Sequence, residues 1–423
     1  MLRRENTTSD ESSYVISPIV QVDAQLAELY LNGHNVVDID VIAPPTTTLQ
    51  RYLSVRSVLS TTSSASISQQ KAAEEKQLQP LEEIGKGFCG VVFNIRGTGR
   101  VVKRAMGVKA HQLQDDFQCH LKAFEAHKQL ESVVVPAPVR FVEAADCQDW
   151  QLGEGLSFAN MMYREPACLL ISERILPLPQ IIRKSLIGVF CPENMREEAL
   201  ASRENKSCLL RLYLGVKRPN IITSGGFTLR NFELTLDRMI HLGLDTSSFV
   251  DAMAESLATL HWAAKIDAFD VEYALGSAPT DNERDRSELR NILRPPNFQR
   301  RTVQVWLLDF NQCQSITADE AGVDKCVTAF YMNDPYYPRP SAKAASMEAE
   351  LWARFASKYL ARSHKFFKFP SPLPGLFITK VEEEAVKRGS VSAEPPKAAG
   401  PPKTLYDKDA EKDKKKKNNR KYV

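Results

Sequence analysis

Three glycines near residue 90 have the spacing of a loop that lies over phosphate groups. Gly85, Gly87 and Gly90 fit the pattern G-x-G-x-x-G. Glycine lacks a Cβ atom, so the backbone of such a loop can approach a bound phosphate closely. The spacing alone also occurs in dinucleotide-binding proteins, so the residues on either side decide what it indicates.

The residues that follow the glycines predict a strand. A dinucleotide-binding loop opens a helix after its last glycine. Here residues 91–95 read Val-Val-Phe-Asn-Ile, which is a β-branched and aromatic run. A turn at residues 97–99 and a further strand ending at Lys103 come next. Strand, glycine loop, strand, turn and strand is the order found in protein kinases. The alternative is a glycine-containing hairpin that binds no ligand.

Lys103 is the residue that we expect to hold the α- and β-phosphates of ATP. In a kinase-like fold this lysine pairs with a carboxylate from the next helix. Residues 114–130 predict that helix, because their apolar residues recur at helical spacing. Glu125 is the predicted partner. The alternatives are that Glu125 is a solvated surface residue, or that Glu131 takes its place.

A further strand is predicted at residues 169–175, after the helix. In a kinase-like fold this strand leads into the hinge. The backbone of a hinge pairs with adenine, and we assign Glu173 to the cofactor-binding residues together with the three glycines and Lys103.

Two acidic segments further along the chain fit the two remaining motifs of protein kinases, the catalytic loop and the metal-binding D-F-G. In residues 265–275, Asp267 falls on the catalytic base of H-R-D-x-x-x-x-N, and Glu272 falls on its metal-binding Asn. An apolar strand at residues 303–308 runs into Asp309-Phe310-Asn311, close to the metal-binding D-F-G. We therefore expect Asp267 to accept the proton of a substrate hydroxyl, and Asp309 and Glu272 to hold Mg²⁺.

Several departures from the protein-kinase pattern stand out. Lys265-Ile266 replaces the His-Arg pair, Glu272 replaces an amide, and Asn311 replaces the glycine of D-F-G. No A-P-E motif follows Asp309. The set resembles aminoglycoside and choline phosphotransferases more than protein kinases. It also leaves open a non-catalytic pseudokinase that serves as a binding scaffold.

The order of the signals predicts an α+β protein with a bilobal, protein-kinase-like fold. Residues 80–176 would form an antiparallel-sheet N-lobe and residues 177–380 a helical C-lobe. Residues 1–79 are expected to be largely disordered, because residues 54–68 are dominated by Ser and Thr. Residues 381–423 are expected to be a disordered tail rich in Pro and Lys.

Composition limits the partners. The 423 residues carry a net charge of +3, and residues 401–423 alone hold nine Lys or Arg and four Asp or Glu. The remaining body is nearly neutral, so nucleic-acid binding is not expected except weakly through the Lys-rich tail. No apolar run approaches the length of about 18 residues that a membrane-spanning helix needs. Eight cysteines without C-x-x-C spacing argue against a zinc finger and predict reduced thiols in the cytoplasm or nucleus.

Several longer motifs resemble the fungal family called domain of unknown function 3669, over about residues 80–380. They include Ser172-Glu173-Arg174-Ile175, Leu260-His261-Trp262, Trp306-Leu307-Leu308-Asp309-Phe310-Asn311 and Asn333-Asp334-Pro335-Tyr336-Tyr337-Pro338. The resemblance implies a fungal source and no established activity. Members often carry the label zinc finger protein, and they have Asp where Asn311 stands here. The resulting expectation is an ATP- and Mg²⁺-dependent phosphotransferase that acts on an unknown phosphate acceptor or protein partner.

Overall fold

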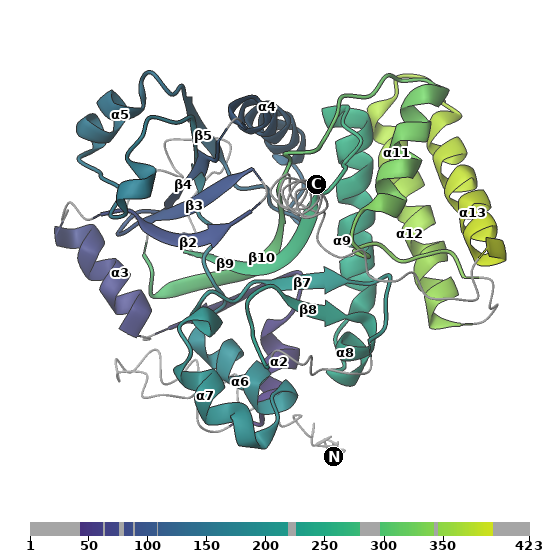
Figure 1. Ribbon diagram of the computed structural model, residues 1–423. Helices are drawn as coiled ribbons and strands as arrows, with labels where there is room; N and C mark the ends of the chain where they lie inside the picture. Colours follow the sequence, from purple (N-terminus) through teal and green to yellow (C-terminus); the bar gives the residue numbers. More distant parts are fainter. Residues whose placement is uncertain are drawn as a thin grey trace, which may run out of the picture.

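Two sheets of five strands each organise the described part of the chain (Figure 1). The computed structural model describes residues 43–61, 64–75, 80–87, 89–107, 109–218, 226–279, 297–341 and 346–391. Helices pack around both sheets, so the expectation of an α+β protein is confirmed. The residues before 43, those between 279 and 297 and the Lys-rich tail lie outside the described residues.

The first sheet contains the glycine hairpin. Its strands are antiparallel and run in the order β2 (Glu82–Lys86), β3 (Gly90–Ile95), β4 (Arg100–Ala105), β6 (Leu169–Glu173) and β5 (Pro138–Val142). Alternation along β3 buries its apolar side chains against a cluster of aromatic and aliphatic residues. The predicted succession of strand, glycine loop, strand, turn and strand is therefore confirmed.

Helix α4 (Ala110–His127) joins the first sheet to the rest of the molecule. Leu113 packs with Leu170 of β6 on one side of the helix. On another side, Ala123 belongs to the large core that the C-terminal helices share. Because one helix contacts both bodies, a side chain on α4 can meet residues from either sheet.

The second sheet has the strand order β1 (Arg56–Ser60), β10 (Arg300–Leu308), β9 (Glu272–Pro279), β7 (Leu210–Tyr213) and β8 (Phe232–Thr235). Only β7 and β8 pair in parallel among these described strands. The expectation of a helical C-lobe over residues 177–380 is thus incomplete, since four of these strands lie within it. Local patterning missed the short strands β7 and β8, because their pairing partners are distant in sequence.

The region before residue 80 is more ordered than we expected. Strand β1 pairs with β10, and Leu49 and Leu53 around helix α2 (Pro45–Tyr52) are fully buried in the main core. In helix α3 (Ser64–Glu75), Gln69 accepts a hydrogen bond from the backbone N–H of Gly97. Pairing with a distant strand and burial of a few apolar residues order this Ser/Thr-rich segment, and the expectation of disorder was wrong there.

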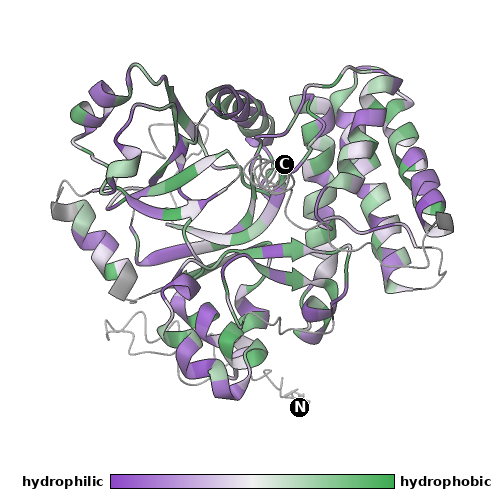
Figure 2. Cartoon of the chain, in the orientation of Figure 1, coloured by the Kyte–Doolittle hydropathy of each residue, from purple (hydrophilic) through white to green (hydrophobic). Residues whose placement is uncertain are grey.

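Helix α5 and the short helix η2 lie beside the first sheet, and the remaining helices lie beside the second sheet or pack on one another in the C-terminal half (Figure 1). Hydrophobic and hydrophilic residues alternate along these helices, as is typical of surface helices (Figure 2). Helix α13 runs past residue 380, the expected end of the C-lobe, as far as residue 391. Their bounds are α5 Cys147–Glu154, η2 Met161–Tyr163, α6 Gln180–Phe190, η3 Glu193–Met195, α7 Arg196–Ala201, η4 Glu204–Lys206, α8 Leu236–His241, α9 Thr246–Thr259, η5 Leu260–Ala264, α11 Glu320–Met332, α12 Met347–Ser363, η6 His364–Phe366 and α13 Leu373–Val391. None of the described helices is both long and apolar enough to cross a membrane.

Candidate functional site

A cavity of about 300 Å³ lies under the glycine hairpin, between the first sheet and the second. Both sheets contribute apolar side chains to its walls, and these are Ile84, Val92, Val101, Leu170, Ile175, Leu209 and Leu308. Charged side chains complete the lining: Lys86, Lys103, Asp116, Glu173, Arg211, Arg230 and Asp309. An apolar slot with charged groups beside it suits a ligand that combines a flat ring with ionised groups.

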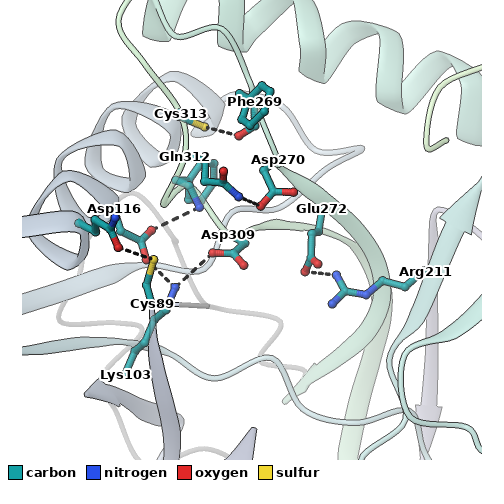
Figure 3. A network of polar contacts seen from close by, with 12 residues as sticks. Cys89, Lys103, Asp116, Arg211, Phe269, Asp270, Glu272, Asp309, Gln312 and Cys313 are labelled. Carbon is teal, nitrogen blue, oxygen red and sulfur yellow. Dashed lines mark hydrogen bonds and ion pairs between the residues drawn. The ribbon is translucent and has the colours of Figure 1, made fainter. Parts of the chain in front are cut away.

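Lys103 of β4 lies between two carboxylates. Its Nζ atom is 2.6 Å from Oδ2 of Asp116 on α4 and 3.2 Å from Oδ1 of Asp309, which follows β10 (Figure 3). The side chain of Asp116 is only 4% exposed and also accepts a hydrogen bond from the backbone N–H of Phe310. Burial by itself lowers the pKa of Lys103, but the two carboxylates outweigh it and raise the pKa. The lysine is therefore a cation under all ordinary conditions.

The predicted pairing of Lys103 with Glu125 is wrong. Glu125 forms an ion pair with Lys128 on the surface, and its side chain is 61% exposed. Asp116 and Glu125 are separated by about two and a half turns of helix, which places them on opposite faces of α4. The sequence analysis did not select Asp116 as the partner of Lys103. A single acidic residue within an apolar stripe resembles a surface residue as long as the helix boundary is unknown.

The structure requires glycine at only one of the three positions of the glycine loop. A Cβ atom on Gly90 would lie 2.5 Å from the carbonyl oxygen of Arg104, so the β3–β4 pairing itself requires glycine there. Gly85 and Gly87 have room for a Cβ atom, and neither has a positive φ. The contacts and backbone angles at residues 85 and 87 therefore do not demand glycine there.

Acidic residues gather around Asp309. Glu272 begins β9 and pairs with Leu308 of β10, so the strand register places it beside Asp309. Asp270 lies on the same side (Figure 3). Asp270 and Asp309 both have left-handed backbones, with φ of 62° and 63°. Such conformations are costly outside glycine and cluster at functional sites.

Burial and repulsion between neighbouring carboxylates raise the pKa values of Asp270 and Glu272. Burial, with a further contribution from Asp309, raises the pKa of Asp270. Burial also raises the pKa of Glu272 to about 7, although its ion pair with Arg211 acts in the opposite direction. Arg211, on β7, was not singled out from the sequence, and it offsets one of the negative charges at the site.

Asp267 lies outside the cavity that contains Lys103. It lines a second cavity, of about 850 Å³, together with residues of α4, α11 and the segment after Asp309. Its Oδ1 atom accepts hydrogen bonds from the backbone N–H groups of Phe269, at 3.1 Å, and Gln314, at 2.9 Å. Burial raises the pKa of Asp267, while these two bonds lower it. Asp267 thus secures the loop, and Asp270 rather than Asp267 lies next to Asp309.

Asn333 supports the loop that carries these acids. Its Oδ1 atom accepts from the backbone N–H of Asp270 at 2.5 Å, and its Nδ2 atom donates to the carbonyl of Ala268 at 2.8 Å. Ala268 and Asp270 are both left-handed residues, so one buried amide stabilises two strained positions. The sequence signal for Asn333 was its place in the Asn-Asp-Pro-Tyr-Tyr-Pro motif, to which no role had been assigned.

Glu173 lines the first cavity at the end of β6. It is buried, and its Oε2 atom accepts a hydrogen bond from the backbone N–H of Ala137 at 3.0 Å. The backbone N–H of Glu173 donates to the carbonyl of Ala137 at 2.8 Å. Glu173 therefore joins β6 to the segment before β5 and shapes this end of the slot.

The two expected metal ligands both have cationic partners. Asp309 contacts Lys103, and Glu272 contacts Arg211. Over the described ranges, no group of three or more His, Cys, Asp or Glu side chains is placed to hold a metal ion. Mg²⁺ commonly binds through one or two carboxylates and completes its shell with water and substrate phosphates. The donor chemistry of Asp309 and Glu272 fits that mode, with the phosphates supplying the other oxygens.

Comparison with known families gives a match over part of the chain. Residues 305–370 match the family model DUF3669, which is described as a zinc finger protein. No curated protein matches the chain. The matched segment contains Asp309 and Asn333, so it supplies part of the acidic cluster and its support.

The zinc finger description does not fit the residues of the matched segment. It contains two cysteines, Cys313 and Cys326, and one histidine, His364, whereas a structural zinc site takes four ligands. The Cys313 thiol is buried and donates to the carbonyl of Phe269. Burial raises the pKa of Cys326 as well as that of Cys313. Both sulfurs are thus protonated core groups and lack the thiolate character of zinc ligands.

Proposed function

We propose that this protein is an ATP- and Mg²⁺-dependent phosphotransferase with a bilobal, kinase-like arrangement, acting on an acceptor that is still to be identified. The observation that carries the proposal is the position of Lys103. Three segments far apart in sequence (β4, α4 and the end of β10) bring one lysine and two carboxylates together at a slot covered by a glycine hairpin. Positioning and charge neutralisation are the main requirements of phosphoryl transfer.

Each part of the cavity has a role in this proposal. The apolar walls would bind the adenine ring, with Glu173 at the hinge end of the slot. The backbone at Gly85 and Gly87 would approach the phosphates, and Lys103 would bind them, oriented by Asp116. Asp309 and Glu272 would hold Mg²⁺, which supplies neutralisation of the negative charge on the phosphates.

The base that accepts the proton of the acceptor hydroxyl is a choice between two aspartates. Asp267 has the sequence position of the base, but one of its oxygens holds the backbone of the loop. Asp270 lies nearer to Asp309, and its raised pKa makes it a stronger base than an exposed aspartate. Comparing Asp267→Asn with Asp270→Asn in a phosphotransfer assay separates the two roles.

A second candidate function is a non-catalytic scaffold of the pseudokinase kind. Its support is that both carboxylates assigned to Mg²⁺ are already paired with cations. In that case the Lys103 pairs would serve only to join the two sheets, and nucleotide would not be needed for binding to a partner.

The deciding experiment is a thermal-shift titration of the full chain with ATP, with and without Mg²⁺. The full chain is required because β1 and α2 belong to the fold. Saturation at 100 times the dissociation constant stabilises a protein by about 2.7 kcal/mol. We expect a Mg²⁺-dependent shift that is lost in Lys103→Ala and Asp309→Asn and kept in the surface control Lys128→Ala. No shift at millimolar ATP with folded protein would refute the nucleotide site and leave the scaffold.

A further inference from the structure

Four cationic side chains line the first cavity, and they differ in their partners. Lys103 pairs with Asp116 and Asp309, and Arg211 pairs with Glu272. The other two, Lys86 and Arg230, are exposed, and neither has a carboxylate partner among the described residues. Two cations at this cavity are therefore available to a ligand.

The inner part of the cavity is not cationic overall. Asp116 and Asp309 line this end together with Lys103 and Arg211, while Glu272 and Asp270, which are not part of the lining, lie next to Asp309 and bring the number of carboxylates there to four. Without Mg²⁺, a polyphosphate chain bound wholly at this inner end would meet more negative than positive charge. Cations at the rim would offset the charge of the outermost phosphate.

Lys86 and Arg230 face the cavity from different parts of the fold. Lys86 ends β2 between Gly85 and Gly87, so it belongs to the glycine hairpin of the first sheet. Arg230 lies just before β8 of the second sheet, and the next residue, Asn231, has a left-handed backbone with φ of 52°. The Oδ1 atom of Asn231 accepts from Arg211 at 3.5 Å, which links the turn that carries Arg230 to the inner ion pair.

We propose that Lys86, beside the first sheet, and Arg230, beside the second, bind the outermost phosphate of the nucleotide. This pair of residues, the rim site, would make the cavity bind triphosphates more tightly than nucleosides. The inference rests on the proposed nucleotide site and adds the residues that read the length of the phosphate chain. Arg230 can donate two hydrogen bonds to a phosphate, while Lys86 adds a point charge from the glycine hairpin.

The experiment measures dissociation constants of ATP, ADP and adenosine for four variants of the full chain: Lys86→Gln, Arg230→Gln, the double variant, and the control Arg203→Gln. Arg203 is exposed and outside the cavity lining. Hydrogen bonds to charged groups predict a loss of about tenfold in ATP affinity for each rim residue. Adenosine affinity should stay unchanged, and the salt dependence of ATP binding should weaken in the double variant.

Two results would overturn the rim site. One is an ATP affinity in the double variant equal to that of Arg203→Gln. The other is an equal loss for adenosine, which would mean that the variants disturb the slot itself. Failure of the proposed nucleotide site is distinguishable, because the wild-type chain would then bind neither ATP nor adenosine.

Inorganic tripolyphosphate, which has no base, tests the rim separately from the slot. Binding to the wild-type chain that is lost in the double variant would support the rim site even without nucleotide binding. Absence of tripolyphosphate binding to a chain that binds neither ATP nor adenosine would overturn it.

Discussion

The pairing of Lys103 with Asp116 rather than Glu125 gives a direct test of the site's architecture. We compare Asp116→Asn with Glu125→Gln, which each remove one charge from α4 and keep the side-chain size. Asp116 has a 4% exposed side chain, 2.6 Å from a lysine that is itself only 16% exposed. Removing one member of a buried pair costs about 3–5 kcal/mol. Because Lys103 keeps Asp309, we expect a loss of about 3 kcal/mol.

Glu125→Gln should cost far less. Its pair with Lys128 is an exposed pair three residues apart on a helix, and such pairs contribute about 0.5 kcal/mol or less. The assay is urea denaturation of both variants, followed by circular dichroism and tryptophan fluorescence at pH 7. A double-mutant cycle of Asp116→Asn with Lys103→Met should show a coupling of about 1–3 kcal/mol. Equal destabilisation by the two α4 variants, or an Asp116→Asn loss below about 0.5 kcal/mol, would refute this account of the site.

Three further predictions test other parts of the structure. Gly90→Ala should destabilise the fold by about 1–3 kcal/mol, since its Cβ atom would overlap the Arg104 carbonyl, whereas Gly85→Ala should leave urea stability nearly unchanged and weaken only ATP binding. Asn333→Ala, which removes two backbone hydrogen bonds, should cost about 2 kcal/mol and lower activity if the chain is a phosphotransferase; unchanged stability would contradict its supporting role. Burial lowers the pKa of His127 to about 4, so the unfolded state binds more protons between about pH 6.5 and 4, and stability falls as the pH falls through that window. His127 should account for about 2 kcal/mol of the stability lost between pH 7 and 5, and His127→Gln should reduce that pH dependence by this amount in urea titrations at both pH values.

Local patterns in the sequence predicted the elements that carry the site. The β-branched run after Gly90 identified β3, and the apolar run before Asp309 identified β10. Asp245 has a residue type that favours a helix N-cap, and it does cap α9 by accepting from the backbone N–H of Ser248. These features depend on neighbouring residues only, because side-chain alternation and capping act over a few positions.

Tertiary structure decided which charges meet. Sequence spacing could not choose between Asp116 and Glu125, because the choice depends on which face of α4 turns toward the sheet. It also grouped Asp267 with Asp309, whereas the loop conformation places Asp267 at a second cavity and Asp270 beside Asp309. The physical reason is that a carboxylate finds its partner through long-range packing, which the spacing of residues along the chain does not encode.

Tertiary structure also decided that the segment before residue 80 is folded rather than disordered. Taken alone, residues 56–60 are short and rich in Ser, and they lack the apolar content to stay folded. Pairing with β10, a strand more than 200 residues away, satisfies the backbone hydrogen bonds on one side of this segment, and Leu59 is buried. Composition therefore determined that residues 56–60 have little tendency to fold by themselves. Only the completed second sheet determined that they are ordered, because a strand is stabilised by the strand beside it.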